Sequence, residues 1–329
     1  MDDRNVSTIT YFIITGISGQ PSFQLLLFLL ILLIFIITLG GNAIIFLLVC
    51  LDHHLHTPMY FFLANLSILD ISCSTITILN ILTSFLSGDN TVSVLKCLVQ
   101  IFAFLSLTCD ELLLLAAMSY DRYVAICRPL HYHLVMNSKL CVLLASLCWG
   151  CGFLESIPTF MGIFKLTCYE SDKVDHLYCD IVPVLKLSCS DTSFLQLYIL
   201  TVGVIVCGFT PFALTFISYI FIITTILSIR SSSGRRKTFY TCSSHLTVVI
   251  CLYSSLVFQY LRPISSINLG SSKYFSLFNV AAVPMLNPLI YSLKNKDVKA
   301  AIRRKINISV VSINNQDHTE NNKTLKILI

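Results

Sequence analysis

Long apolar stretches separated by short polar connections dominate the chain. A helix needs roughly 20 apolar residues to cross a bilayer. We read seven such stretches, which cover residues 23–50, 59–82, 98–120, 140–164, 194–229, 239–261 and 274–293. The connections between them leave no room for a soluble domain. The pattern therefore predicts an all-α membrane protein, a bundle of seven transmembrane helices.

A different pattern follows the last stretch. From Lys294 to Lys305, Lys and Arg alternate with small apolar residues, which predicts a short amphipathic helix on the membrane surface. The remainder, up to residue 329, is polar and rich in Asn. We therefore divide the chain into an N-terminal segment 1–22, a membrane domain 23–293, and an amphipathic helix with its tail, 294–329.

Composition and charge agree with this division. The chain is 55% hydrophobic and only 12% charged, whereas soluble domains carry about a quarter charged residues. Most of the 22 Lys and Arg residues fall on one side of the predicted bundle if the N-terminus is outside. Residues 1–22 are then extracellular and 294–329 cytoplasmic. The net charge of +5 lies mainly on the inner side, where we expect a lipid surface, not nucleic acid, as its partner.

The outer side carries two modification signals. Asn5-Val6-Ser7 is a glycosylation sequon that this topology places outside. Four of the 14 cysteines also stand outside the apolar stretches: Cys97, Cys168, Cys179 and Cys189. That compartment is oxidising, so disulfides are expected, and four cysteines allow three pairings among which spacing does not choose. A metal site is a weaker alternative, because no CxxC pair or nearby His cluster accompanies them.

Asp70, Asp110 and Glu111 lie inside predicted spans. Each charged carboxylate there costs roughly 2.5–3.5 kcal/mol on insertion scales, so Asp70 and Glu111 should face the bundle interior. We expect them to meet each other, Asn42 or Asn287, in a cluster that could hold a sodium ion or share a proton. A protonated structural pair is the alternative. Asp110 precedes Glu111 and projects about 100° away from it, and its partner is not visible in the sequence.

Two further features favour a bundle that changes shape. Asp121 and Arg122 stand where the third stretch meets the inner surface, and a salt bridge between them can hold the arginine there. A snorkelling arginine is the alternative interpretation. Asn287 and Pro288 interrupt the last apolar stretch. No nucleophile–base pair or phosphate-binding glycine loop is apparent, so we expect a receptor without cofactor, not an enzyme. A channel or transporter would need a polar path that few residues could supply.

At this point the chain resembles a known family. Asp121-Arg122-Tyr123 and Asn287-Pro288-Leu289-Ile290-Tyr291 resemble the motifs of rhodopsin-like G-protein-coupled receptors. Finer motifs resemble class II (tetrapod-type) olfactory receptors; they are 55–63, 118–127, Ser218-Tyr219, 237–246 and 284–288. The resemblance spans Gly41 to about Val298, and its motifs are highly specific. Ser119, Thr238, Tyr240, Lys294 and Asp110 depart from the usual residues, and Asp110 could alter the interior hydrogen-bond network.

The resemblance implies specific roles. It pairs Cys97 with Cys179 and Cys168 with Cys189. It implies coupling to a stimulatory, olfactory-type heterotrimeric G protein with cyclic AMP downstream, and a place in the plasma membrane of sensory cilia. The switch residues would be Asp121, Arg122, Tyr123, Tyr219, His245, Asn287, Pro288 and Tyr291. The central polar site would comprise Asn42, Asp70 and Glu111.

The resemblance also places an odorant pocket between the third, fifth, sixth and seventh helices. Helical spacing from the motifs selects Phe104, Leu105, Thr108, Gly203, Val204, Cys207, Tyr253, Leu256, Val257, Tyr260, Leu277 and Val280. None of these is ionised, so we predict a small, neutral, mostly apolar ligand; Arg262 is the residue most able to overturn this. Ordinary helix packing is the alternative for each residue. A non-odorant metabolite is the alternative ligand, because the motifs report coupling and lineage.

Overall fold

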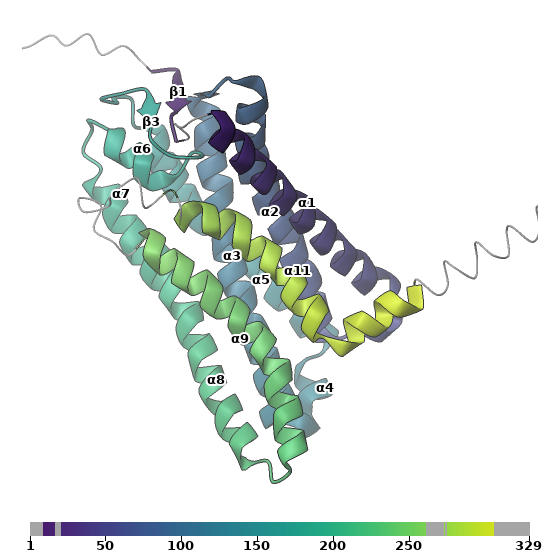
Figure 1. Ribbon diagram of the computed structural model, residues 1–329. Helices are drawn as coiled ribbons and strands as arrows, with labels where there is room; N and C mark the ends of the chain where they lie inside the picture. Colours follow the sequence, from purple (N-terminus) through teal and green to yellow (C-terminus); the bar gives the residue numbers. More distant parts are fainter. Residues whose placement is uncertain (1–8, 17–20, 261–272, 274, 306–329) are drawn as a thin grey trace, which may run out of the picture.

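The computed structural model describes residues 9–16, 21–260, 273 and 275–305. Long helices stand side by side as a bundle (Figure 1). Five of its spans are α1 (Pro21–Leu51), α2 (Pro58–Ser87), α3 (Val94–Cys127), α5 (Ser138–Phe164) and α9 (Ser232–Tyr260). The fifth span along the chain joins α7 (Ser193–Tyr198), η3 (Ile199–Phe209) and α8 (Thr210–Ser228), and the last contains η5 (Phe278–Ala282) and α11 (Val283–Lys294).

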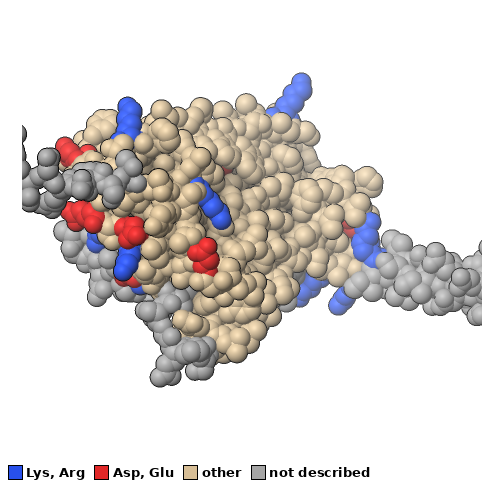
Figure 2. Space-filling view, turned by 90° about the horizontal axis from the view of Figure 1, so that it is seen from above, with Lys and Arg blue, Asp and Glu red and all other residues tan. Residues whose placement is uncertain are grey.

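The described helices confirm the predicted class of membrane protein. Six are long and apolar enough to cross a bilayer, and a bent pair, Phe275–Tyr291 with Lys296–Lys305, supplies a seventh candidate. Many large apolar side chains on the bundle are exposed, as lipid-facing residues would be. Figure 2, the view from above, shows a surface made mostly of uncharged residues, with few Lys, Arg, Asp or Glu side chains.

Local sequence signals explain where several helices begin and end. The Ser93 hydroxyl accepts a hydrogen bond from the Lys96 amide, and the Asn137 side chain accepts one from the Leu140 amide, so both residues cap helix N-termini. Gly88 ends α2 with a φ of 67°, a conformation that glycine adopts without strain. These caps lie beyond the apolar stretches, because a helix continues into polar residues until its orphan backbone groups are satisfied.

The fifth span contains the largest departure from regular α-helix. Residues Ile199–Phe209 form a π-helix of 11 residues, which passes directly into α8. Pro211 follows at the start of α8. Proline has no amide hydrogen, so it removes one backbone hydrogen bond at this point. In a π-helix, residues five apart in the sequence take the places that residues four apart take in an α-helix.

Three short strands, absent from the all-α prediction, add a small sheet at the end of the bundle that the predicted topology places outside, called the outer end below. β1 (Tyr11–Ile14) pairs antiparallel with β2 (Thr91–Ser93) and parallel with β3 (Lys173–Val174). Figure 1 shows β1 and β3 at the end opposite the α8–α9 connection. Phe12 of β1 is fully buried and packs edge-on against Tyr169, 5.1 Å between ring centroids. Strands this short give almost no periodic signal in the sequence.

Two disulfides fasten the long outer connection. Cys97 at the start of α3 is bonded to Cys179, with 5.3 Å between their Cα atoms, and Cys168 is bonded to Cys189, with 5.4 Å. These are the pairs that the resemblance implies. The connection also contains a short helix, α6 (Ile181–Leu187), whose start is capped by Asp180. One buried apolar cluster contains Phe12 of β1, Ile181 of α6 and the bonded pair Cys97 and Cys179. The small sheet and this disulfide therefore pack against each other.

The helix after the last span is fixed to the opposite end of the bundle, the predicted inner end. Lys296–Lys305 turns by 79° from the preceding helix, and Figure 1 shows this sharp turn in yellow. Val298 and Ala301 are buried against the main core, as an amphipathic helix predicts. Arg304 forms a salt bridge with Asp52 at 2.7 Å. Asn5 and the tail 306–329 lie outside the described residues.

Candidate functional site

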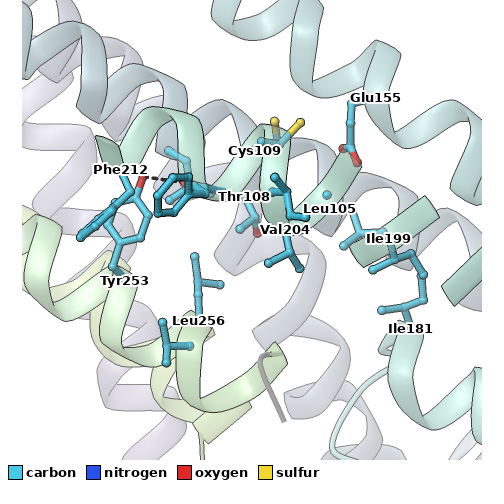
Figure 3. Close-up of a pocket in the computed structure, with 17 residues that line it drawn as sticks. Leu105, Thr108, Cys109, Glu155, Ile181, Ile199, Val204, Phe212, Tyr253 and Leu256 are labelled. Atoms are coloured by element: carbon cyan, nitrogen blue, oxygen red, sulfur yellow. Dashed lines mark hydrogen bonds between the residues drawn. The ribbon is translucent and has the colours of Figure 1, made fainter. Parts of the chain in front are cut away.

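A cavity of about 390 Å³ opens between the third, fourth, fifth and sixth spans. A cavity of this size is within the range of small-molecule sites. Figure 3 shows its labelled lining residues. The wall consists of Leu105, Thr108, Cys109, Leu112, Glu155, Ile181, Ile199, Gly203, Val204, Ile205, Cys207, Gly208, Phe209, Phe212, Tyr253, Leu256 and Val257.

The π-helix η3 forms one entire side of this cavity. Ile199, Val204 and Phe209 all line it at intervals of five residues, as do Gly203 and Gly208. Ile199, Gly203 and Cys207 also line the cavity at intervals of four residues, so the wall combines four-residue and five-residue spacings. The two glycines lack side chains that would otherwise occupy the space. η3 therefore contributes seven of the residues that line the cavity.

Eight of the twelve predicted pocket residues line the cavity. They are Leu105, Thr108, Gly203, Val204, Cys207, Tyr253, Leu256 and Val257. Phe104 instead packs against Tyr178, 5.8 Å between ring centroids, and Val280 and Leu277 pack in that same cluster with the first two spans. The described seventh span thus contributes nothing to this wall, and the fourth span takes its place. The side chain of Tyr260 and the whole of Arg262 lie outside what the structure describes.

The cavity wall includes an acidic residue that the predicted set does not contain. Glu155 of α5 is half-buried at the cavity, and its carboxylate lies close to the thiols of Cys109 and Cys207. Figure 3 shows Glu155 and Cys109 on the same side of the cavity, with Tyr253 and Leu256 across from them. The fourth span was not considered as a pocket wall, although a carboxylate within a membrane span is itself a signal of a functional position.

At the other side, Tyr253 joins the sixth span to the π-helix. Its hydroxyl donates to the Gly208 carbonyl at 3.4 Å, a contact drawn as a dashed line in Figure 3. Its ring meets Phe212 edge-on, with 5.1 Å between centroids. Because η3 leaves the α-helical pattern, the Gly208 carbonyl is available to a side chain from the sixth span. Tyr253 therefore couples the cavity wall to α9.

Asn287 holds the central polar site together. Its Nδ2 donates to both carboxylate oxygens of Asp70, at 3.1 and 3.0 Å, and Asn287 also forms a hydrogen bond with Glu111. Asp70 is 1% exposed and Glu111 9% exposed, so both face the interior as predicted. Asn42 does not join them, because its amide donates to the backbone carbonyls of Thr38 and Pro284.

The predicted salt bridge between Asp121 and Arg122 is absent. The ion pairs among the described residues do not include it, and Asp121 instead accepts a hydrogen bond from the Tyr132 hydroxyl at 2.9 Å. Tyr132 belongs to α4 (Tyr132–Val135), which follows η2 (Pro129–His131) in the inner connection. Neighbouring residues on a helix project in different directions. Within the part of the chain that is described, Arg122 Nε and the Tyr291 hydroxyl are buried without a hydrogen-bond partner.

Tyr219 and His245 link the inner halves of the fifth and sixth spans. The Tyr219 hydroxyl lies 2.9 Å from His245 Nδ1 and donates to the Cys242 carbonyl at 3.2 Å. Their rings are stacked with an angle of 3° between them. Both side chains are buried. Of the predicted switch residues, this pair forms the direct contact between the two spans, while Tyr123 packs against Phe221 of α8.

Asp110 lies against a glycine of the fourth span. A β-carbon on Gly152 would overlap the Asp110 carboxylate and lie 2.6 Å from the Ser106 carbonyl oxygen. Asp110 is fully buried. Gly152 thus leaves space for the side chain of Asp110, at a position that is not normally acidic in the family that the chain resembles. No periodic signal in the sequence predicts that these two residues are in contact.

A polar network above the cavity was also missed. Gln259 of α9 donates to Asp180 at 3.1 Å, and Asn279 of η5 donates to Gln259 at 3.3 Å. Beside it, His176 is buried with its Nε2 3.1 Å from the Ser276 hydroxyl. Burial lowers the pKa of His176 below its ordinary value, against the opposing influence of Asp180. These residues connect the outer loop to the sixth and seventh spans.

Comparison with known proteins assigns this arrangement to a family. A family profile described as "Olfactory receptor" matches residues 31–308. Human olfactory receptor 6C1 is 45% identical over 298 residues, which cover 91% of this chain and 95% of that receptor. Mouse olfactory receptor 5AR1 is 42% identical over 309 residues, covering 93% and 98%. The solved structure of squid rhodopsin shares the fold, with a TM-score of 0.69 at 20% identity over 88% of this chain and 85% of that one.

Proposed function

This chain belongs to the olfactory receptor family, and on that premise we propose that it binds a small, mostly apolar odorant in the cavity and activates a stimulatory heterotrimeric G protein. Cyclic AMP would rise in response. The cavity carries the proposal: it has a volume of about 390 Å³, and its wall is apolar apart from Glu155, two thiols and two hydroxyls. The family consists of signalling receptors, so an enzymatic activity is not expected.

The shape of the cavity explains how binding could reach the inner surface. Its wall includes η3 of the fifth span and Tyr253 of the sixth. The same two spans meet again at the inner end through Tyr219 and His245. A ligand that binds one arrangement of these spans more tightly shifts the population toward it. A change from 1:99 to 99:1 requires about 5.5 kcal/mol of differential affinity, so a small odorant would activate only part of the receptors.

The inner end supplies groups that a G protein could engage. Arg122 is half-buried, and its Nε lacks a partner within the described part of the chain. The hydroxyl of Tyr291 is likewise buried without a hydrogen-bond partner among the described residues. Groups buried without hydrogen bonds are costly, and a second conformation that pairs them would recover part of that cost. We therefore assign Arg122, with Tyr219 and Tyr291, to the active-state contact.

We extend the proposal to the orientation of the receptor in the membrane. The N-terminus is outside, the helix Lys296–Lys305 lies at the inner leaflet, and sensory cilia are the expected place of action. Asn5 would then be glycosylated. The central polar site would hold a sodium ion or a shared proton, since Glu111 Oε1 and Asn287 Oδ1 have no hydrogen-bond partner among the residues described and oxygen donors suit a hard cation.

The test combines a ligand screen with two matched pairs of variants. The chain is expressed with a cyclic AMP reporter, and a broad odorant panel is applied. Arg122→Ala should abolish the response at unchanged surface expression, while Lys139→Ala, an exposed cation of α5, should not. Val204→Trp should fill the cavity and remove the response, whereas Val206→Trp, which is 55% exposed on the same helix, should preserve it. A full response from the Arg122→Ala receptor would overturn the coupling role.

A further inference from the structure

We propose that Cys109, Cys207 and Glu155 form a Zn²⁺ site in the wall of the cavity. One ligand atom from each residue lies within 4.8 Å of the other two. The residues come from α3, η3 and α5, three separate elements of the bundle. All three also line the cavity. A bound ion would therefore join three spans at the place where a small molecule would sit.

The donor set selects the metal. Two cysteine sulfurs and one carboxylate oxygen combine soft and hard donors. Cu(I) favours thiolate and thioether ligands, and Mg²⁺ or Ca²⁺ favour oxygen ligands throughout. Zn²⁺ accepts sulfur and carboxylate oxygen in one tetrahedral site. Of the common cations, Zn²⁺ therefore matches this set best.

The geometry suits a site with one open position. Zn–S bonds of about 2.3 Å and Zn–O bonds of about 2.0–2.2 Å place tetrahedral ligand atoms roughly 3.4–3.8 Å apart. From the limit of 4.8 Å, each pair of atoms needs to close by at most about 1.4 Å, which side-chain rotation can supply. A β-carbon on Gly203 would lie 3.6 Å from the Glu155 carboxylate, so the carboxylate has free space beside it. Three protein ligands leave the fourth position facing the cavity, as in zinc sites that bind a further ligand.

The charge of Glu155 gives an independent reason for a cation. No ion pair among the described residues includes Glu155. Its carboxylate accepts a hydrogen bond from the Ser156 hydroxyl, 3.4 Å from Oε2, which is long for a hydrogen bond to a carboxylate. A charged carboxylate within the membrane costs roughly 2.5–3.5 kcal/mol. Zn²⁺ would give this carboxylate a direct cationic partner; both thiols would bind as thiolates and release their two protons to water, so the site as a whole would keep a single negative charge.

The proposal deepens the odorant-binding function, because it rests on the same cavity. Its first test uses purified receptor with neither odorant nor G protein, so that a failure here is separate from a failure of signalling. Co²⁺ replaces Zn²⁺ as a probe, because thiolate ligands give Co²⁺ a charge-transfer absorption that histidine and carboxylate sites lack. Receptor with its two disulfides intact should show this absorption, saturating at one Co²⁺ per chain and vanishing when Zn²⁺ is added.

Variants assign the ligands. Cys109→Ser and Cys207→Ser should each reduce the absorption, and the double variant should remove it. Glu155→Gln should weaken Co²⁺ binding by at least about 10- to 100-fold, the loss that is typical when a residue that only orients a metal ligand is removed. Cys251→Ser removes a half-buried free cysteine of α9 that does not line the cavity and should change nothing. An absorption that persists in the double variant, or is missing from the wild type, would overturn the proposal.

A second measurement avoids substitutions that could prevent folding. Wild-type receptor is alkylated with iodoacetamide with and without Zn²⁺, and each cysteine is followed by mass spectrometry. Zn²⁺ should slow alkylation of Cys109 and Cys207 together and leave Cys251 unchanged. Equal rates for Cys109 and Cys207 in both conditions would contradict a shared metal.

Discussion

Asn287 of the seventh span donates to both carboxylate oxygens of Asp70 in the second span, at 3.1 and 3.0 Å. The two residues are 217 positions apart in the chain, and both are buried. Asn287 also bonds Glu111 of the third span. A single carboxamide thus ties three spans together at the centre of the bundle, immediately before Pro288, which weakens the backbone of its own helix.

Replacing Asn287 by Ala should destabilise the folded receptor. The change leaves a buried carboxylate without donors, which costs about 1–3 kcal/mol. Thermal unfolding of purified receptor measures the loss. Asn80→Ala is the control, because Asn80 bonds only a carbonyl of its own helix, Ile76, at 2.8 Å. An unfolding temperature that falls equally in both variants would contradict a special role for Asn287.

Gly152→Ala should separate the third and fourth spans. The added methyl group would overlap Asp110, and overpacking of this kind costs typically 1–3 kcal/mol. Gly150→Ala is the matched control, since a β-carbon there meets nothing within 4 Å. Surface expression and thermal unfolding are measured together. If Asp110 causes the conflict, Asp110→Ala in the Gly152→Ala background should recover part of the loss; no recovery would assign the conflict to the backbone of Ser106.

His245→Phe should raise signalling in the absence of ligand. The phenyl ring keeps the stacking on Tyr219 but removes its 2.9 Å hydrogen-bond partner. A hydrogen bond contributes about 0.5–1.5 kcal/mol, which corresponds to a change of roughly 2- to 12-fold in the balance between conformations. Basal cyclic AMP is compared at equal surface expression, with Ser243→Ala as control, because Ser243 is a half-buried residue of the same helix whose hydroxyl donates to the Tyr240 carbonyl. Basal signal equal to wild type would show that the pair does not restrain the sixth span.

The helix after the last span should remain attached down to acidic pH. The hydrogen bond from Arg304 lowers the pKa of Asp52 from 3.8 to about 2. A depressed carboxyl pKa contributes stability that is present above pH 3.8 and is lost as the pH falls toward 2. Asp52 should therefore stay ionised between pH 5 and 8 and keep its ion pair with Arg304. The protection of the backbone amides of residues 296–305 against hydrogen exchange should then be the same across this pH range. Arg304→Ala should speed this exchange at neutral pH, and Arg303→Ala, exposed beside it, should not. Equal exchange in the two variants would exclude the salt bridge as the anchor.

The bundle could be predicted from the sequence because its signal is long and repetitive. Spans of about 20 apolar residues have few alternative structures in lipid, and Asp70 and Glu111 had to face inward for the same reason. β1 could not be predicted, since its four residues are held by pairing with segments far away in the chain. The Asp121–Tyr132 contact likewise depends on the fold of the inner connection.

Part of the cavity wall could be predicted from the sequence for a related reason. Helical spacing placed Leu105, Thr108 and Leu256 correctly, because their helices keep the α-helical period. On the fifth span the three predicted residues line the cavity, but η3 brings Ile199 and Phe209 to the wall as well, and neither was in the predicted set. Glu155 was missed because the resemblance places the pocket between the third, fifth, sixth and seventh helices, without the fourth. Its residue type was nevertheless a signal, because a carboxylate within a membrane span is costly unless it has a partner.

The π-helix also has a consequence for how such a receptor can change over generations. Loss of one residue between positions 199 and 209 could be absorbed by a return to the α-helical pattern, leaving the span long enough to cross the membrane. Everything on the outer side of the deletion would rotate, and a new set of side chains would face the ligand. Tyr219 and the inner half would keep their positions. Deletion of a single codon could therefore change which ligands this receptor binds while leaving its signalling half unchanged.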